Sequence, residues 1–487
     1  MSKEHRENYK PGLSVDDGRR KREETAVTIR KAKKSERLNQ RRRISRSQTT
    51  EIEQDNPGCR KKLFDKNPQH LLEAIRHYRR LLSNATEPPV EQIISAGLTS
   101  RFVELLTYDN MPHVQFEAAW ALTNITSGMS EHTKHVVDLG ATAHFVRLLQ
   151  STNENVRDQS VWALGNIAGD SSDNRDLVLR SGGMLPMLAQ FRMTTNESLL
   201  NNAVWALSNL CRGKPRPDFE SVRVAIPTLT QLLYHQHDGI LTDACWALSY
   251  LSDGENAHIQ CIIDSAACMR LIELLTHHND SVKTPALRTI GNIATGDDTQ
   301  TQTLLNNSLL PCLLPLMQHP KRNIRKETCW TISNITAGNA DQITSVFKAG
   351  FVPLLVDAMK QGQFDVKKEA AWAISNATVG SNMEQIQYLV DENCIPPLCD
   401  MLAVRDSSIV IVALEALENI LKTSNDAYVH AVEEAGGLDK IDELQNHANN
   451  AVYEKAVTLL EKYYSAVDDV PENVPTVNTN GFFAFGT

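Results

Sequence analysis

The chain is poor in aromatic residues and contains no long apolar run. Only 6% of its 487 residues are Phe, Trp or Tyr, while 41% are hydrophobic, which favours an aliphatic, helical core. The longest apolar run, around Leu309–Met317, is about half the length of a membrane-spanning helix. The opening residues MSKEHRENYK include no apolar segment, so we expect neither a secretory signal nor membrane insertion.

Cysteine and the common catalytic motifs also set limits. The nine cysteines are scattered and include no CxxC pair, which argues against a disulfide framework or a structural zinc module. The sequence contains no P-loop, GxGxxG, GxSxG or HExxH motif. The pairs His235/His237 and His277/His278 fall at turns, where we expect solvated side chains. The sequence therefore predicts no enzyme, no cofactor and no metal.

Charge is divided unevenly along the chain. Residues 1–46 contain 16 Lys and Arg against 7 Asp and Glu, a balance of +9. Since the whole chain carries −9, the remainder carries −18. A basic arm attached to an acidic body indicates that the arm binds something acidic, and the body is the nearest acidic surface.

A repeat of about 42 residues organises the body. Segments such as EAAWALTNITSG, QSVWALGNIAGD and ETCWTISNITAG align without gaps, and extending their spacing in both directions gives ten units. All six tryptophans of the chain occupy one position of the repeat. That anchor position is held by Tyr78, Trp120, Trp162, Trp205, Trp246, Arg288, Trp330, Trp372, Glu415 and Val457.

Each unit contains more than one predicted helix. Apolar residues recur at three- and four-residue spacing upstream of the anchor, as in 143–151 and 351–359. Gly350 opens the second of these segments, and the glycines of Asn-x-x-x-Gly, Gly128 and Gly380, predict left-handed caps after the anchor helix. A helical repeat of this length is typical of an all-α armadillo or HEAT solenoid, in which neighbouring units stack into a superhelix.

The anchor helix offers one polar face. Glu117, Trp120 and Asn124 are spaced i−3, i and i+4, so they share that face. A single Trp there would be read as a core residue with a helix-end Asn. Seven successive units carrying the anchor pattern favour a ladder along one surface instead.

The chemistry of such a ladder selects an extended, cationic peptide. Asn can pair with the C=O and N–H of a peptide backbone, and indole faces accept Lys or Arg with a gain of about 0.5–2 kcal/mol. This face would repel phosphate backbones, so we expect no nucleic acid in the groove. The acidic residues at the slot ends are Glu117, Asp170, Asp243, Asp298, Glu327 and Glu369.

The ladder is interrupted in its middle. Trp246 is followed by Tyr250 in place of Asn, and Arg288 replaces Trp while Asn292 is kept. Two Trp/Asn blocks remain, 120–205 and 330–372. Four units separate Trp162 from Trp330, roughly 40 Å, which an extended linker of about 12 residues would span.

The repeat motif, its spacing and the Arg288 interruption resemble the importin α (karyopherin α) family of nuclear import adaptors over nearly the whole chain. The resemblance implies a major and a minor site for Lys/Arg-rich nuclear localisation signals. The major site would comprise Trp120, Asn124, Gly128, Thr133, Gln159, Trp162, Asn166, Asp170, Trp205 and Asn209. The minor site and the region between would comprise Asp243, Trp246, Tyr250, Arg288, Asn292, Glu327, Trp330, Asn334, Glu369, Trp372 and Asn376.

The basic arm is similar to the family's importin-β-binding segment. Its charge predicts disorder when free, and its tethering to the groove predicts self-inhibition at a high effective concentration. Gln40 stands where the family's key lysine is expected, which implies either weaker self-inhibition or a one-residue shift that places Arg41 at Asp170. The importin-β-binding residues would be Arg19, Arg20, Lys21, Arg22, Arg30, Lys31, Lys33, Lys34 and Arg37. The self-inhibitory cluster would be Arg41, Arg42 and Arg43.

The C-terminal segment 433–464 is similar to the family's last repeat, where an export receptor with Ran-GTP recovers the adaptor. The terminal FAFG (483–486) resembles a single nucleoporin-type motif. Candidate export contacts are Glu433, Glu434, Asp439, Asp442 and Glu443. The expected regions are a basic arm (1–46), a flexible linker (47–70), an armadillo solenoid (71–464) and a disordered tail (465–487).

Two other functions compete with an adaptor that shuttles between cytoplasm and nucleus. The first is an armadillo scaffold of the adhesion or signalling type, whose groove would be basic and would bind acidic tails. The second is a nucleic-acid-binding protein that acts through its basic arm and would bind RNA without the groove.

Overall fold

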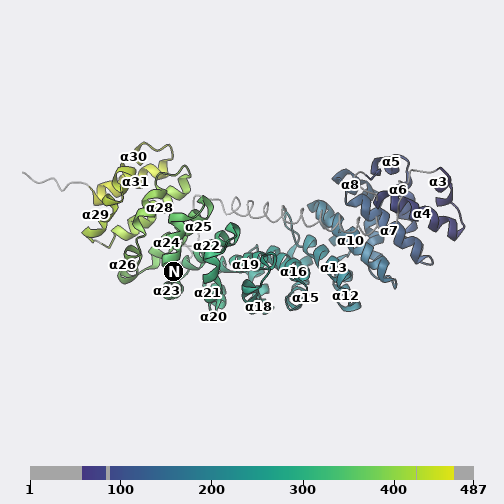
Figure 1. The fold of residues 1–487 in the computed structure, drawn as a ribbon, viewed down its shortest axis with the longest axis horizontal. Helices are drawn as coiled ribbons and strands as arrows, with labels where there is room; N and C mark the ends of the chain where they lie inside the picture. Colours follow the sequence, from purple (N-terminus) through teal and green to yellow (C-terminus); the bar gives the residue numbers. More distant parts are fainter. Residues whose placement is uncertain (1–56, 84–87, 424, 465–487) are drawn as a thin grey trace, which may run out of the picture. The chain divides into compact units, whose positions relative to one another are not determined.

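The computed structural model describes residues 57–83, 88–423 and 425–464 (Figure 1). Within these residues the chain divides into two compact units, of which the first ends at Gly338 and the second begins at Asn339. All regular elements of these residues are helices. None of the described helices is both long and apolar enough to cross a bilayer. The arm, the self-inhibitory cluster, Gln40 and the FAFG tail lie outside the described residues.

The N-terminal unit is a stack of helical repeats that follows a two-helix start. The start is α3 (Pro57–Leu63) and α4 (Pro68–Ser83). The next repeats are α5 (Val90–Ser95), α6 (Leu98–Leu105), α7 (Pro112–Thr126); α8 (Ser130–Asp138), α9 (Ala141–Leu148), α10 (Glu154–Asp170); and α11 (Ser172–Arg180), α12 (Met184–Met193), α13 (Glu197–Leu210). Then follow α14 (Phe219–Arg223), α15 (Ile226–Leu232), α16 (Asp238–Leu251); α17 (Asn256–Asp264), α18 (Ala267–Glu273), η1 (Leu274–Thr276), α19 (Asp280–Ala294); and α20 (Asp298–Asn306), α21 (Leu309–Leu313), η2 (Leu314–Gln318), α22 (Arg322–Thr336).

The C-terminal unit repeats the same pattern three times. Its helices are α23 (Ala340–Lys348), α24 (Phe351–Gln361), α25 (Phe364–Gly380); α26 (Met383–Asp391), α27 (Ile395–Met401), α28 (Ser407–Leu421); and α29 (Asp426–Glu434), α30 (Gly437–Glu443), η3 (Leu444–Asn446), α31 (Asn450–Tyr463). The sequence predicted more than one helix for each unit, and the structure has three.

The longest helix of each repeat is the third, and it carries the anchor residue. Tyr78 lies in α4 and Val457 in α31, so the anchor position predicted from the spacing falls in a helix at both ends of the described residues. In the N-terminal unit each third helix packs on the next, in the order α4, α7, α10, α13, α16, α19 and α22 (Figure 1). In the C-terminal unit α25 packs on α28 and α28 on α31.

Asparagine side chains cap several of the third helices in the N-terminal unit. Asn153, Asn196 and Asn279 each accept a backbone N–H of the first turn of α10, α13 and α19, which satisfies donors that a helix start otherwise leaves unpaired. Behind the caps, the apolar face is closed by fully buried residues such as Leu122 and Ile290. Periodic burial of this face explains why the helices recur regularly, and the asparagine caps help to fix where α10, α13 and α19 begin.

The left-handed caps predicted at Gly128 and Gly380 are wrong. The α7 helix ends at Thr126 with a right-handed Ser127, and Gly380 is the last residue of α25. Gly128 is needed for space instead, because a β-carbon there would lie 2.7 Å from His132 Nδ1. Left-handed glycines, with φ of +65° to +80°, stand before the second helices, where the chain reverses within two residues; they are Gly97, Gly140, Gly350 and Gly436.

Part of the segment predicted as a flexible linker, 47–70, is helical. Helix α3 occupies Pro57–Leu63, and Leu63 is completely buried. The Leu63 carbonyl accepts a hydrogen bond from Arg101 Nε at 3.1 Å. These contacts attach α3 to the first repeat, so the linker prediction fails for residues 57–63.

Candidate functional site

The anchor tryptophans are more deeply buried than a surface ladder suggests. Trp162, Trp205, Trp246 and Trp330 are each at most 5% exposed, and Trp120 is half-buried. The Cζ3 atoms of Trp205 and Trp330 lie 2.3 Å from where a β-carbon would stand on the glycine of the preceding third helix. Burial of a large aromatic side chain stabilises the stack. The packing role that the sequence analysis set aside is therefore real.

Neighbouring rings nevertheless follow one another along the N-terminal unit. The ring centroids of Trp162 and Trp205 are 5.7 Å apart with an interplanar angle of 43°. At the predicted interruption, Trp246 and Tyr250 stack at 6.0 Å and 20°. A cavity of about 400 Å³ opens beside Trp246, and its lining includes Thr284 and Lys321.

The ladder asparagines tie each third helix to the one before it. Four of them donate through Nδ2 to the backbone carbonyl three residues after the preceding anchor, a contact that no spacing within one helix could reveal. The pairs are Asn166 with Thr123 (3.3 Å), Asn209 with Gly165 (2.8 Å), Asn292 with Ser249 (2.8 Å) and Asn334 with Gly291 (3.1 Å). Asn124 donates instead to Ser83 Oγ at 3.0 Å.

One asparagine keeps an unused acceptor. Asn166 is completely buried, and among the described residues its Oδ1 accepts no hydrogen bond. A buried amide oxygen without a donor costs about 1–3 kcal/mol. A ligand N–H would remove that cost.

Several residues predicted to form the lysine pocket lie near one another on α7, α8 and α10. Asp170, half-buried at the end of α10, accepts hydrogen bonds from Ser130 Oγ at 2.7 Å and from Asn174 Nδ2 at 3.1 Å. Thr133 Oγ1 donates to Thr126 O at 3.2 Å. These contacts join the start of α8 to the ends of its two neighbours.

Gln159 and Gly128, two further predicted pocket residues, make other contacts. The carbonyl of Gln159 accepts from Thr123 Oγ1 at 3.4 Å, which links α10 to α7. The ring of His132 closes over Gly128, and its Nε2 lies 2.6 Å from Glu91 Oε1.

Two of the carboxylates expected to select cations already have arginine partners. Glu327 forms a bidentate pair with Arg288, with Oε2 to Nε and Oε1 to Nη2 both at 2.7 Å. Glu117 accepts from Arg76 Nε at 3.0 Å and from Arg79 Nε at 2.7 Å. Sequence reasoning missed Arg76 and Arg79, although Arg79 directly follows the anchor Tyr78.

The remaining predicted residues fall on separate parts of the fold. Asp243 is buried in α16, and Asp298 begins α20. Glu369, Trp372 and Asn376 belong to α25 of the C-terminal unit, so the block 330–372 is divided between the two units. The candidate export residues are all exposed on α29 and α30; these are Glu433, Glu434, Asp439, Asp442 and Glu443.

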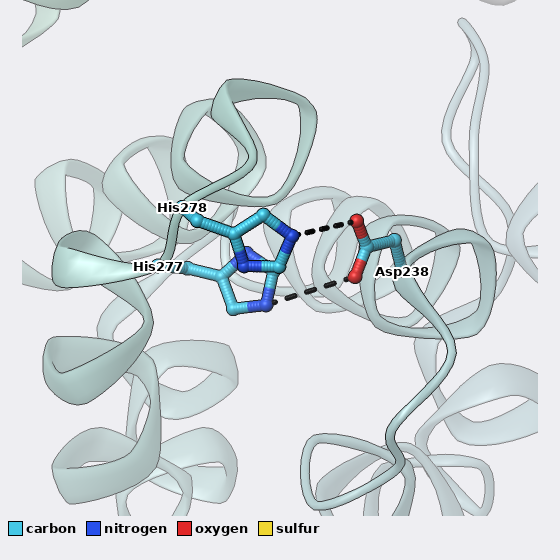
Figure 2. A group of neighbouring side chains, drawn as sticks. All are labelled: Asp238, His277 and His278. Atoms are coloured by element: carbon cyan, nitrogen blue, oxygen red, sulfur yellow. Dashed lines mark ion pairs between the residues drawn. The ribbon is translucent and has the colours of Figure 1, made fainter.

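A second group of side chains has metal-ligand chemistry. Figure 2 shows Asp238 facing the rings of His277 and His278, with carboxylate oxygens 3.7 Å and 3.5 Å from the two Nε2 atoms. His277 Nδ1 accepts the backbone N–H of Asn279 at 3.1 Å. The neutral ring then carries its proton on Nε2. That tautomer suits a carboxylate neighbour and not a metal ion, which needs the Nε2 lone pair.

The same arrangement recurs one repeat later. His319 Nδ1 accepts the backbone N–H of Lys321 at 3.1 Å, and its Nε2 lies 3.2 Å from Asp280 Oδ1. The two histidines thus belong to a repeated turn that faces the first residue of the preceding third helix. The prediction of a solvated side chain is wrong for His277, which is largely buried, and is confirmed for His278, which is 80% exposed.

This fold and site define an armadillo-repeat protein. Matches to the Armadillo/beta-catenin-like repeat cover residues 86–127, 129–169, 171–212, 221–253, 255–295, 297–337, 339–379 and 382–422. An Atypical Arm repeat matches 426–476, and an Importin beta binding domain matches 5–87, well beyond the arm predicted at 1–46. An engineered protein of known structure aligns with a TM-score of 0.77 at 28% identity, covering 84% of this chain and 98% of its own.

Two relatives indicate which family of armadillo-repeat proteins the chain belongs to. Importin subunit alpha-2 of Arabidopsis thaliana is 48% identical over 492 residues, covering 95% of this chain and 92% of the relative. Importin subunit alpha-1b of Oryza sativa subsp. japonica is 47% identical over 409 residues, covering 82% and 77%. The chain belongs to the importin α family, whose members are non-enzymatic nucleocytoplasmic transport factors. It is a nuclear import adaptor, and neither the scaffold nor the nucleic-acid alternative is favoured.

Proposed function

We propose that the N-terminal unit binds Lys/Arg-rich localisation signals as extended peptides along α7, α10 and α13. The observation that carries this proposal is the unused Oδ1 of the buried Asn166. In an extended ligand, a backbone N–H would donate to that oxygen whatever side chains the ligand carries. The ring faces of Trp120, Trp162 and Trp205 would hold the aliphatic stems of its basic residues.

Asp170 would select the principal lysine. Its two hydrogen bonds from Ser130 and Asn174 hold the carboxylate in place, and each oxygen can accept further bonds. An ammonium ion that donates to Asp170 would meet Thr133 and the backbone near Gly128 on the other side. Charge-assisted bonds of this kind are about twice as strong as neutral ones.

The remaining roles belong to this proposal by family resemblance. The importin-β-binding domain would engage importin β and, when importin β is absent, occupy the groove with Arg41–Arg43. The second block, 330–372, would hold a second basic cluster. The exposed acids of α29 and α30 would meet an export receptor with Ran-GTP, FAFG would meet nucleoporins, and the protein would shuttle between cytoplasm and nucleus.

The test compares two asparagines at one register of the repeat. Asn166 and Asn419 both follow an anchor by four residues, and Asn419 Nδ2 donates to Thr378 Oγ1 at 3.1 Å. The anchor before Asn419 is Glu415 and not Trp. In the full chain, Asn166→Ala should weaken binding of a fluorescent Lys-rich peptide by about tenfold, the value of one lost buried hydrogen bond. Asn419→Ala should leave the affinity unchanged, and equal affinities in both variants would refute the proposal.

A further inference from the structure

The first ladder tryptophan already has a cation on its ring. The guanidinium carbon of Arg79 lies 4.3 Å from the centroid of Trp120. In the described part of the chain, the other cation–ring pairs involve Phe or Tyr and not Trp. A basic side chain on an indole face is the contact that the proposed function assigns to a bound peptide.

Arg79 is also held by the carboxylate that shares the face of Trp120. Its Nε donates to Glu117 Oε2 at 2.7 Å, and Glu117 stands three residues before Trp120. Arg79 is 8% exposed and Glu117 5% exposed, so water screens this pair poorly. The indole face and the carboxylate together form a complete binding site for one arginine side chain, and a residue of the same chain fills it.

The backbone around Arg79 fixes it in that position. Ser83 Oγ donates to the Arg79 carbonyl at 2.8 Å and accepts from Asn124 Nδ2 at 3.0 Å. The ladder asparagine of α7 is thus tied to the same turn of α4 that presents Arg79. An ordinary ion pair between two helices would not need this alignment with the Trp and Asn of the ladder.

The neighbouring Arg76 also pairs with Glu117 but serves as a structural comparison for Arg79. Its Nε donates to the other oxygen of Glu117 at 3.0 Å, but its side chain is 43% exposed. It makes no recorded contact with the Trp120 ring. Glu117 would therefore keep one arginine partner if Arg79 were removed.

We propose that Arg79 is a built-in ligand that closes the α4 end of the ladder and limits how many basic residues a peptide can place there. The inference rests on the proposed peptide-binding function. Arg79 would act as a specificity-determining residue, because its guanidinium competes with the next ligand cation for the face of Trp120. Without it, that face and Glu117 become one more slot for Lys or Arg.

The experiment measures how affinity depends on peptide length. Fluorescent peptides with four, five, six and seven consecutive lysines between neutral flanks are titrated into full-length wild-type, Arg79→Ala and Arg76→Ala proteins. We expect Arg79→Ala to bind its longest peptide about fivefold more tightly than wild type, which corresponds to the upper range of a solvent-exposed cation–ring contact, with the shortest peptide unchanged. Arg76→Ala should show the wild-type dependence on length.

For each protein, the affinity for the seven-lysine peptide is divided by the affinity for the four-lysine peptide. If this ratio is the same in Arg79→Ala as in wild type, the inference is wrong. Failure of the proposed function looks different, because then no peptide would bind wild type in a way that depends on Asn166. A second measurement avoids peptides altogether: millimolar methylguanidinium should raise the unfolding temperature of Arg79→Ala but not of wild type or Arg76→Ala. An equal response of all three proteins would show that Trp120 and Glu117 do not form a cation site.

Discussion

The indole ring of Trp205 fills the space that a side chain on Gly165 would need. A β-carbon built on Gly165 would lie 2.3 Å from Trp205 Cζ3, and the same relationship joins Gly291 to Trp330. The anchor tryptophan thus packs on the third helix before its own. It stabilises the stack with one part of its ring, and the proposed ligand would contact the other.

Replacing Gly165 with alanine should destabilise the protein, although alanine usually stabilises a helix relative to glycine. Alanine is normally better than glycine inside a helix by about 1 kcal/mol. At this position the new methyl group would displace Trp205, and we expect Gly165→Ala to lower the free energy of unfolding by about 1–3 kcal/mol. Chemical denaturation measures the change, and Gly291→Ala should behave in the same way. A stabilised Gly165→Ala protein would contradict this view of the stack.

Charge at Asp170 should control peptide affinity in the N-terminal unit. Asp170→Asn keeps the shape of the side chain and removes the charge, so we expect binding of a Lys-rich peptide to fall by about tenfold, within the range for a charge-assisted bond. Asp170→Lys should bind more weakly still. Fluorescence anisotropy on the full chain measures both, with Glu369→Arg as the corresponding change in the second block. Wild-type affinity in Asp170→Lys would remove Asp170 from the site.

The Arg288–Glu327 pair should be important for stability. The two side chains are 11% and 4% exposed and form two bonds of 2.7 Å. Removal of one member of a buried pair typically costs about 3–5 kcal/mol, so we expect Arg288→Ala to destabilise the protein by that amount. A double-mutant cycle with Glu327→Gln measures the coupling directly. A coupling near zero would mean that the pair is dispensable.

The hydrogen bond from Asn279 to Asp238 should make the free energy of unfolding depend on pH in the acidic range. A hydrogen bond from Asn279 Nδ2 to Asp238, at 2.6 Å, is the main cause that lowers the pKa of this carboxyl, and His277 and His278 add to it. A lowered folded-state pKa stabilises the protein above the unfolded pKa of about 3.9, and that stability is lost as pH falls through the folded value. Asn279→Asp keeps the cap of α19 but turns the donor into a second carboxylate.

We therefore expect Asn279→Asp to be less stable than wild type by about 1–2 kcal/mol at pH 7. The difference should shrink as pH falls below about 4, because both carboxylates then take up protons. Urea titrations between pH 3 and pH 7 provide the measurement. Asn449→Asp, a cap of α31 whose Oδ1 accepts only Ala451 N–H among its recorded contacts, is the matched control and should show no such dependence.

Buried thiols should resist alkylation. Burial raises the pKa of Cys268 and of Cys399 to about 11 and that of Cys394 to about 12. Since the thiolate is the reactive form, iodoacetamide at pH 8 should leave these three residues unmodified in the folded protein. Mass spectrometry after digestion identifies the modified sites. Rapid labelling of Cys268 under native conditions would show that its helix opens readily.

The sequence by itself determined the repeat and the positions of its polar face. Spacings of three and four residues within a helix fix which side chains share a face, so Glu117, Trp120 and Asn124 could be grouped without coordinates. The period of about 42 residues located every third helix from Tyr78 to Val457. Local rules failed at Gly128 and Gly380, because neither glycine has a left-handed backbone, and at Gly128 the nearby ring of His132 limits the space instead.

Only the tertiary structure decided how one repeat meets the next. Arg79 and Trp120 are 41 positions apart in the chain, and Gly165 and Trp205 are 40 apart. Whether such residues touch depends on how two stacked helices are rotated about their axes, which no pattern within a single helix encodes. That register places an arginine on Trp120, gives Glu117 and Glu327 internal partners and leaves the amide oxygen of Asn166 without a donor.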